Sequence, residues 1–286
     1  MAGKHGAVDI MQNIDIKDYE HNNLLAYGKL VTFDTTMESY PDKRTRTIRV
    51  LLPESYDGVK RFPILYMHDA QLLFPESGGR PKWNVDESLK KLSEEGLEIV
   101  VVGIDTSMHR GSELCPDCPP TKDHFMLNGE EPTGHLYSRF IVEHLKPIID
   151  ANFMVLDGPE NTGVGGASMG GMISHYIALE YPEVFGKVLV FSPAYSFIEW
   201  DVMKERMEAY DWDRIKNSKF YILSGGNDVE RRLFTLRSSV RCYESLMEKD
   251  MDEKNVILVT DSRLMHHETS WGAMFADAVR YLFERT

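Results

Sequence analysis

Cysteine is scarce in this sequence, and long apolar runs are lacking. The chain of 286 residues contains 3 cysteines, Cys115, Cys118 and Cys242. They are too few for a disulfide framework at this length, so we expect a reducing compartment. The first ten residues lack the apolar segment of a secretory signal, although a chain whose signal had been removed would look the same. No apolar run approaches membrane-spanning length. We therefore expect a cytoplasmic protein without a membrane partner.

Net positive charge is also lacking. The formal net charge of −13 at pH 7 would repel nucleic acid and anionic membranes over most of the surface. A neutral or locally cationic substrate fits this charge better. We expect an N-terminal arm over residues 1–23 and a single domain over residues 24–286, because no linker-like stretch divides the rest of the chain. The sequence does not determine the oligomeric state.

Strand-like and helix-like segments alternate along most of the chain. Two β-branched, apolar runs at 24–33 and 45–52, separated by a turn-rich stretch, predict a hairpin. Further strands are predicted at 62–67, 97–104, 186–191, 220–224 and 256–260, and helices at 83–96, 134–150, 172–181, 201–215, 230–250 and 268–284. This alternation predicts the α/β class, with a mostly parallel central sheet, helices on both faces and the hairpin as an antiparallel edge.

The stretch Gly166-Ala-Ser168-Met-Gly170 has the pattern of a serine on a sharp turn between a buried strand and a helix. Glycines on either side of the serine let the two backbones approach closely. A Gly-rich turn that contains a serine by chance is the simpler alternative. The strand-like run before it and the helix-like run after it favour the first interpretation, so we predict that Ser168 is a nucleophile.

Suitable partners for Ser168 occur later in the chain. Asp228 lies in the turn after the predicted strand 220–224, and a pair of histidines at 266 and 267 lies in the loop after the last strand. A serine hydroxyl needs a histidine to remove its proton, and a carboxylate orients that histidine. The order Ser, Asp, His is that of α/β-hydrolase triads. Glu230 and Asp261 are alternative acids, but Asp228 sits directly in the turn after its strand.

The loop after the predicted strand 62–67 is expected to complete an oxyanion hole. In such enzymes one backbone N–H comes from this loop and the other from the residue after the nucleophile. We predict the amides of Gln71 and Met169 for these two roles. His68 and Asp69 are interpreted as residues that hold the loop, because the later histidine and aspartate already fit the catalytic roles.

Six segments in register give the chain a family resemblance. They are His68-Asp-Ala-Gln-Leu-Leu-Phe74, Trp83-Asn-Val-Asp86, Val102-Gly-Ile-Asp105 with Arg110, Gly166-Ala-Ser-Met-Gly-Gly171, Phe185-Gly-Lys-Val188 with Ser192-Pro193, and His266-His-Glu-Thr-Ser-Trp271. From about Gly28 onward the chain resembles the putative-esterase family, which includes siderophore, feruloyl and acetyl-xylan esterases. The resemblance implies an α/β-hydrolase fold and serine ester hydrolysis with no metal or organic cofactor.

The family pattern also distinguishes the two histidines. His266 matches the histidine of its His-x-Glu-x-x-Trp motif, so the resemblance makes His266 the base and His267 a loop residue. Glu268 would then favour the first turn of the closing helix, and Trp271 would pack that helix down. The chain departs from the family at Ala70, where glycine is usual, and at His267, where asparagine is usual, but neither change removes a required group.

One further constellation, His109, Cys115, Cys118 and His124, has metal-ligand chemistry. The region is short and proline-rich, and Arg110 with Pro116 fits the family's ordinary loop. A loop that binds no metal is therefore preferred to a zinc site.

The loop over residues 105–133 should overhang Ser168, because it leaves the carboxyl end of a central strand. We predict Arg110 from this loop, with Tyr195 and Trp200, as substrate-binding residues, although core packing explains the aromatic pair equally well. An open site of this kind suits a small-molecule or oligosaccharide ester, such as an acylated sugar or a siderophore-type ester. An acyltransferase with the same triad, or a hydrolase fold retained only for binding, is the alternative.

Overall fold

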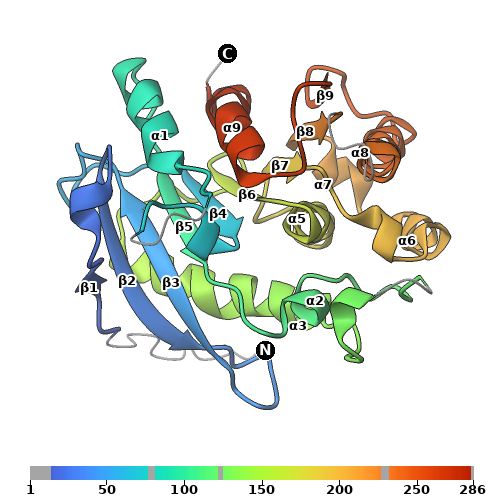
Figure 1. Ribbon diagram of the computed structural model, residues 1–286, viewed down its shortest axis with the longest axis horizontal. Coiled ribbons are helices and arrows are strands. Elements are labelled where there is room, and N and C mark those ends of the chain that lie inside the picture. The colour runs from blue at the N-terminus through green and yellow to red at the C-terminus, as the bar shows by residue number, and fades with distance from the viewer. Residues whose placement is uncertain (1–13, 77–80, 122–124, 227–231, 285–286) are drawn as a thin grey trace, which may run out of the picture.

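The structure, a computed structural model, describes residues 14–76, 81–121, 125–226 and 232–284. Within these ranges nine strands form one sheet in the order β1-β2-β3-β5-β4-β6-β7-β8-β9 (Figure 1). The strands are β1 Lys17–Asp18, β2 Lys29–Thr36, β3 Thr45–Leu52, β4 Ile64–His68, β5 Val100–Ile104, β6 Thr162–Ala167, β7 Lys187–Phe191, β8 Lys219–Gly225 and β9 Val256–Asp261. The strands β4 to β9 are parallel, while β1, β2 and β3 pair antiparallel at one edge.

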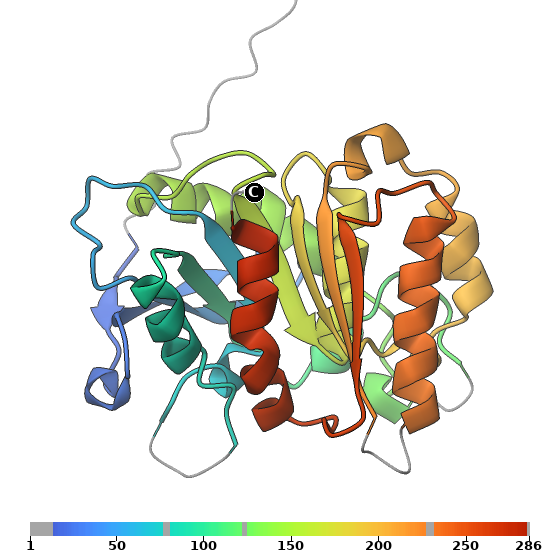
Figure 2. The same ribbon diagram turned by 90° about the horizontal axis from the view of Figure 1, so that it is seen from above.

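Helices cover both faces of the sheet, as the strand and helix pattern predicts. One face carries α1 Val85–Glu94 and α9 Glu268–Phe283, which lie side by side in Figure 2 and contact each other. The other face carries α5 Met169–Glu180, α6 Trp200–Met207, α7 Trp212–Ile215, α8 Arg232–Met247 and the segment α3 Gly134–Arg139, Phe140–Leu145 and α4 Lys146–Asn152. The middle part of that segment is π-helical. The α/β-hydrolase class is confirmed.

Burial on both faces accounts for the composition of the central strands. Every residue of β4, β5 and β6 is buried, and two apolar clusters fill the layers above and below the sheet. A strand covered on both sides has no solvent face, so its apolar residues run continuously instead of alternating with polar ones. The central strand β4 has β5 on one side and β6 on the other, an arrangement that places ligand sites at its carboxyl end.

The predicted hairpin is confirmed, but its first strand begins at Lys29 and not at residue 24. Asn22–Leu24 instead forms a 3-10 turn. The Asn22 side chain donates to the carbonyl of Leu30 at 2.9 Å and accepts from its amide at 2.8 Å. These two bonds hold the turn against β2. The strand β1, which falls within the predicted arm of residues 1–23, pairs with β2.

The predicted helix at 201–215 is also corrected, because the chain forms α6 and α7 with a break between them. The indole N–H of Trp212 donates to the carbonyl of Met207 at 2.8 Å. This bond uses a carbonyl at the end of α6 and so favours a helix terminus there. No helix among the described residues is long and apolar enough to cross a bilayer.

A buried ion cluster ties the loop over residues 105–133 to the antiparallel edge. This loop contains α2 Arg110–Glu113 and a 3-10 turn at Phe125–Leu127. The Glu113 side chain, 1% exposed, accepts two hydrogen bonds from Nη2 of Arg46, 2% exposed, at 2.7 and 2.9 Å. Nη1 of Arg44 donates to the same carboxylate at 3.0 Å. The cluster therefore fixes the loop that brings Arg110 over the carboxyl end of the sheet.

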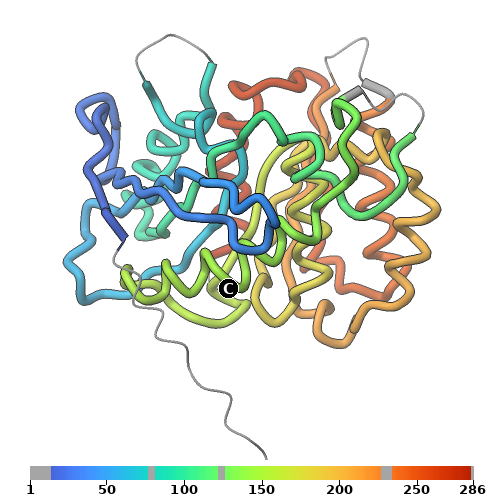
Figure 3. The backbone as a smooth tube through the Cα atoms, turned by 90° about the horizontal axis from the view of Figure 1, so that it is seen from below, coloured from blue at the N-terminus to red at the C-terminus, as the bar shows by residue number. Residues whose placement is uncertain are grey.

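The far end of the β2–β3 hairpin is held in a second place. Thr35 Oγ1 lies 3.0 Å from Nε2 of His144, and the Ser39 hydroxyl donates to the carbonyl of Leu136 at 2.7 Å. Figure 3 shows the hairpin, in blue, lying beside this green helical segment. The edge of the sheet is thus attached to the α3–α4 segment and to the loop over the site.

The Glu113→Gln variant tests the ion cluster. Removing the carboxylate leaves two arginine side chains without their buried partner, so the free energy of unfolding should fall by about 3 kcal/mol in urea denaturation. Glu143→Gln is the matched control, because Glu143 pairs with Arg139 on an exposed helix surface, where less than about 1 kcal/mol is expected. Equal effects of the two substitutions would contradict the structural role of the cluster.

Candidate active site

Ser168 occupies a sharp turn between β6 and α5. Its backbone has φ 59° and ψ −122°, a conformation that non-glycine residues rarely adopt and that costs free energy. The Ser168 amide donates to the carbonyl of Phe191 at 2.9 Å, and its carbonyl accepts from the amide of Ala194 at 3.1 Å. Both partners belong to β7 or to the residues just after it. The neighbouring strand therefore holds the turn in its strained geometry.

Two glycines make this turn possible. A Cβ atom on Gly166 would lie 2.9 Å from the carbonyl carbon of Gly170, and one on Gly171 would lie 2.8 Å from the carbonyl oxygen of Phe191. Real Cβ atoms do not approach backbone this closely. Gly166 is therefore required where β6 meets α5, as the sequence pattern predicts. The second close contact lies at Gly171 and not at Gly170, the second glycine of the motif, because a Cβ on Gly170 would approach no atom closer than 3.5 Å.

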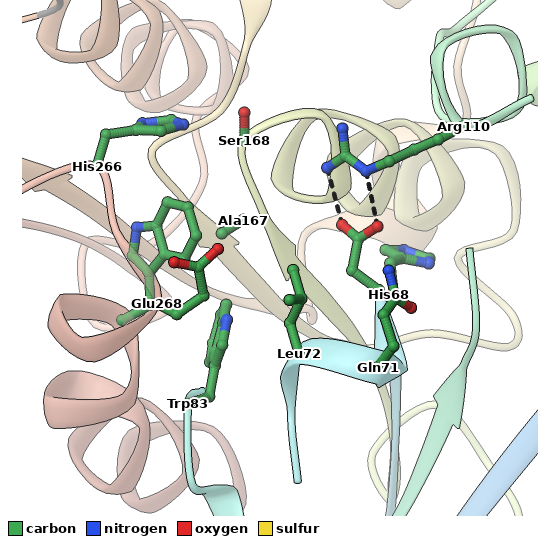
Figure 4. Close-up of a pocket in the computed structure, with 11 residues that line it drawn as sticks. His68, Gln71, Leu72, Trp83, Arg110, Ala167, Ser168, His266 and Glu268 are labelled. Carbon is green, nitrogen blue, oxygen red and sulfur yellow. Dashed lines mark hydrogen bonds and ion pairs between the residues drawn. The ribbon is translucent and has the colours of Figure 1, made fainter. Parts of the chain in front are cut away.

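A cavity of about 340 Å³ opens at Ser168 (Figure 4). Its lining comes from the segments after β4, β5, β6 and β9 and from the start of α1 and α9. The lining residues are His68, Asp69, Gln71, Leu72, Trp83, Arg110, Ala167, Ser168, His266, Glu268 and Trp271. The structure therefore brings Ser168 and His266, which are 98 positions apart in the sequence, to one cavity.

The two adjacent histidines have different surroundings. His266 lines the cavity, and its ring lies edge-on to Trp271 with centroids 5.0 Å apart. His267 is the N-cap of α9, where its Nδ1 accepts from the amide of Thr269 at 3.3 Å. Its imidazole is therefore engaged in capping the helix, and His267 is not among the residues that line the cavity. This geometry agrees with the assignment of His266 as the base.

The acid cannot be placed in the same way. Asp228 and the alternative Glu230 lie outside the described residues. The third candidate is Asp261, whose carboxylate accepts a hydrogen bond from Nη2 of Arg263 at 2.6 Å. Hydrogen bonds from the Arg263 side chain and amide lower the pKa of Asp261 to about 2. Asp261 is thus committed to Arg263 at the end of β9, and Asp228 stays the predicted acid.

Hydrogen bonds to its side chain and to its backbone carbonyl hold Gln71 in place. Gln71 lies in the 3-10 turn Ala70–Leu72 that follows β4. Its side-chain Oε1 accepts from the amide of Thr106 at 3.1 Å, and the ammonium of Lys82 donates to its carbonyl. Met169 is the first residue of α5, where backbone N–H groups have no partner within the helix. The two predicted oxyanion donors therefore belong to elements that flank Ser168.

His68 and Asp69 hold this loop in place. Asp69 has φ 57°, and its carboxylate forms a two-point ion pair with Arg110, from Nε at 2.7 Å and from Nη2 at 2.8 Å. Burial acts to raise the pKa of Asp69, but the charge and hydrogen bonds of Arg110 outweigh it and lower that pKa. Nδ1 of His68 lies 2.9 Å from the hydroxyl of Tyr137, and burial lowers the pKa of His68 to about 4. His68 is therefore neutral near pH 7.

Arg110 lines the cavity, but the predicted aromatic walls do not. Tyr195 is 0% exposed, its hydroxyl is hydrogen-bonded to Nδ1 of His175, and its ring packs against Trp200 with centroids 4.8 Å apart. Neither ring lines the cavity. The prediction for Tyr195 is corrected, because the chain after β7 folds back into the layer of α5 and α8, where its ring lies in the core. The Trp200 ring is partly buried and packs against that core.

The apolar walls come instead from Leu72, Trp83 and Trp271. The rings of Trp83 and Trp271 lie with centroids 5.6 Å apart, and Trp83 stacks on Phe191 at 5.5 Å. Sequence reasoning named Trp83 only as part of a motif and Trp271 only as a packing residue. Both rings line the cavity because α1 packs against α9, a contact between elements that the sequence pattern does not contain.

Three of the four residues considered for zinc, His109, Cys115 and Cys118, lie in the described part of the chain. There, no group of three or more His, Cys, Asp or Glu side chains could hold a metal ion. Burial raises the pKa of Cys115 to about 12 and that of Cys118 to about 11. Nδ1 of His109 is paired with Glu130 at 2.6 Å. His124 lies outside the described residues.

Comparisons with known proteins agree with this geometry. The family model described as "Putative esterase" matches residues 40–282. The protein YbbA of Bacillus subtilis (strain 168), described as uncharacterized, is 26% identical over 250 residues, which are 83% of this chain and 92% of YbbA.

Two solved esterases have similar structures. A ferulic acid esterase of the anaerobic fungus Anaeromyces mucronatus has a TM-score of 0.63 and 21% identity, covering 89% of this chain and 90% of that one. The enterobactin esterase of Shigella flexneri has a TM-score of 0.67 and 18% identity, covering 88% of this chain and 58% of that one.

The chain therefore belongs to the putative-esterase family, as the sequence motifs predict. It is an enzyme, and its class is that of the carboxylic ester hydrolases.

The Asp69–Arg110 pair makes a prediction about pH. Because the folded-state pKa of Asp69 is lowered, the pair contributes stability above the unfolded-state pKa of about 4, and this contribution is lost as the pH falls through the lower folded-state value. Asp69→Asn should therefore reduce the free energy of unfolding by about 2 kcal/mol above pH 5, and by less as the pH falls below 4. Urea denaturation between pH 3 and pH 7 measures this difference.

Asp42→Asn is the control for that experiment, since Asp42 pairs with Arg44 on the surface. A much smaller change is expected for this exposed pair. A loss of stability in Asp69→Asn that stayed constant down to pH 3 would contradict the role of the ionised Asp69 carboxylate.

Proposed function

We propose that the protein hydrolyses carboxylic esters through a serine acyl-enzyme, with Ser168 as nucleophile, His266 as base and Asp228 as the acid that orients the base. The observation that carries this proposal is that Ser168, on its strained turn, and His266 line the same cavity. A serine needs a base within reach to become nucleophilic near neutral pH. The membership of the esterase family supports the same chemistry.

Each residue has a defined role in the proposed reaction. Ser168 Oγ attacks the ester carbonyl carbon as His266 takes the hydroxyl proton. The backbone amides of Gln71 and Met169 stabilise the oxyanion that forms. The alcohol leaves with the proton from His266, and the acyl group stays on Ser168. Water then attacks this ester, His266 again transfers the proton, and the carboxylic acid is released.

The size of the cavity limits what can be bound beside Ser168. A volume of about 340 Å³ is near the lower end of the range for small-molecule sites, roughly 300–1,000 Å³. One acyl or alcohol unit would occupy the cavity, and the rest of a larger ester would extend outside. The names of the similar structures, a ferulic acid esterase and an enterobactin esterase, support an acylated sugar or a siderophore-type ester as substrate.

Ser168→Ala should abolish the reaction. The loss of the nucleophile should lower kcat for aryl acetates and hydroxycinnamate esters by about a million-fold, and a fluorophosphonate should no longer label the protein. Ser262 is an exposed serine on the β9–α9 loop, and Ser262→Ala should keep both ester turnover and fluorophosphonate labelling. Turnover by Ser168→Ala within tenfold of the parent would refute the assignment of the nucleophile.

His266→Ala and His267→Ala form a matched pair for the base. His266→Ala should lose activity by about five orders of magnitude, together with the dependence of kcat/KM on a group that titrates near neutrality. His267→Ala should keep both and lose about 1 kcal/mol of stability, because it removes the cap of α9. The reverse result would move the base to the next residue and leave Ser168 as nucleophile.

A further inference from the structure

The charges that line the cavity are not balanced. Asp69 and Arg110 neutralise each other through their two-point ion pair. His68 is neutral near pH 7, and His266 must be neutral at rest to act as a base. Among the lining residues only Glu268 then remains, on the wall opposite Arg110 (Figure 4). The cavity therefore carries one negative charge that no residue of its lining matches.

The carboxylate of Glu268 is directed into the cavity. Glu268 is the first residue of α9, its side chain is 23% exposed, and Figure 4 shows it on the same side of the cavity as Trp83. Among the described residues its carboxylate accepts no hydrogen bond, and its one basic neighbour within 4.0 Å is His267, whose Nε2 lies 3.7 Å from Oε2. That separation is longer than a hydrogen bond. The carboxylate is thus available to a ligand.

The field of Glu268 extends across the cavity. Burial lowers the pKa of Arg110, but Asp69 outweighs this effect, and Glu268 contributes in the same direction as Asp69. Trp83 and Trp271, which are 5% and 6% exposed, line the same cavity as this carboxylate. A carboxylate next to aromatic rings is chemically suited to a cation that carries alkyl groups, because the rings contact the alkyl groups while the carboxylate balances the charge.

We propose that the wall formed by Glu268, Trp83 and Trp271 is a subsite for a positively charged group of the ester, an ammonium or alkylammonium. This acidic wall deepens the proposed function and rests on it, because it defines the substrate class of the same cavity. The acidic surface, with a net charge of −13, adds to the attraction of a cationic ester. An anionic group would be repelled by Glu268 and would find Arg110 already paired with Asp69.

Two pairs of esters of equal shape test the acidic wall. Acetylcholine and 3,3-dimethylbutyl acetate differ in charge on the alcohol side. Methyl 4-(trimethylammonio)butyrate and methyl 5,5-dimethylhexanoate differ in charge on the acyl side. In the parent enzyme, kcat/KM should favour the cation about tenfold in at least one pair, measured by titration of the acid released. In Glu268→Gln that preference should disappear, so that kcat/KM becomes about equal for the cationic and the neutral ester of each pair.

Glu87→Gln is the control, since it removes the same charge from an exposed position on α1 that does not line the cavity. It should keep the preference for the cation, because only a charge within the cavity is expected to distinguish the two esters. A preference lost equally in both variants would show that it comes from the whole surface and would overturn the subsite. An equal loss for neutral and cationic esters in Glu268→Gln would also overturn it, because Glu268 would then act on catalysis.

Inhibition of the parent enzyme gives a measurement that needs no variant. Choline should inhibit the hydrolysis of a neutral ester at about tenfold lower concentration than 3,3-dimethylbutanol, and equal inhibition would overturn the subsite. The proposed function is separable from this result. Hydrolysis that depends on Ser168 but ignores charge would refute the acidic wall alone, whereas no hydrolysis that depends on Ser168 would refute the proposed function.

Discussion

The reversal of the chain at Ser168 is the constraint on which the rest of the site depends. A strand that becomes a helix within one residue forces its backbone segments into contact, and only glycine at Gly166 and Gly171 leaves room for that contact. The strain at Ser168 is offset by hydrogen bonds with the residues at the end of β7. This turn places Ser168 at the carboxyl end of the sheet, where the loops after the other strands converge.

The loops around this turn are fixed by charge, and the packed layers beneath them by apolar contact. The buried carboxylate of Glu113 holds the loop over residues 105–133 to the antiparallel edge, and that loop delivers Arg110 to Asp69. Lys82 and Thr106 hold the backbone and side chain of Gln71. A wall of the cavity is therefore built from interactions between segments distant in sequence. The result is a rigid rim around a small site, a form that favours orientation of a bound ester.

Much of the architecture follows from short-range patterns. The fold class, the hairpin and the strand–serine–helix unit are predicted correctly, because apolar periodicity and glycine spacing are local properties. The errors have identifiable causes. The strand β2 begins later than predicted because the Asn22 side chain forms two hydrogen bonds with the backbone of Leu30 and holds a turn there. The helix predicted at 201–215 is two helices in the structure, because the indole N–H of Trp212 donates to the carbonyl of Met207. Both causes are hydrogen bonds of one side chain, which a pattern of apolar residues does not contain.

The sequence by itself determined the esterase family and the turn that carries Ser168, because both depend on residue types at fixed spacing. The division into arm and domain, the cytoplasmic location and the catalytic roles of Ser168, Asp228 and His266 stay predictions. Only the tertiary structure decided which side chains reach the cavity. Tyr195 lies in the core, while Glu268 lines the cavity on the wall opposite Arg110. The reason is physical: whether a side chain meets solvent, core or ligand depends on neighbours from other elements, and those neighbours exist only once the sheet and its two helical layers have packed together.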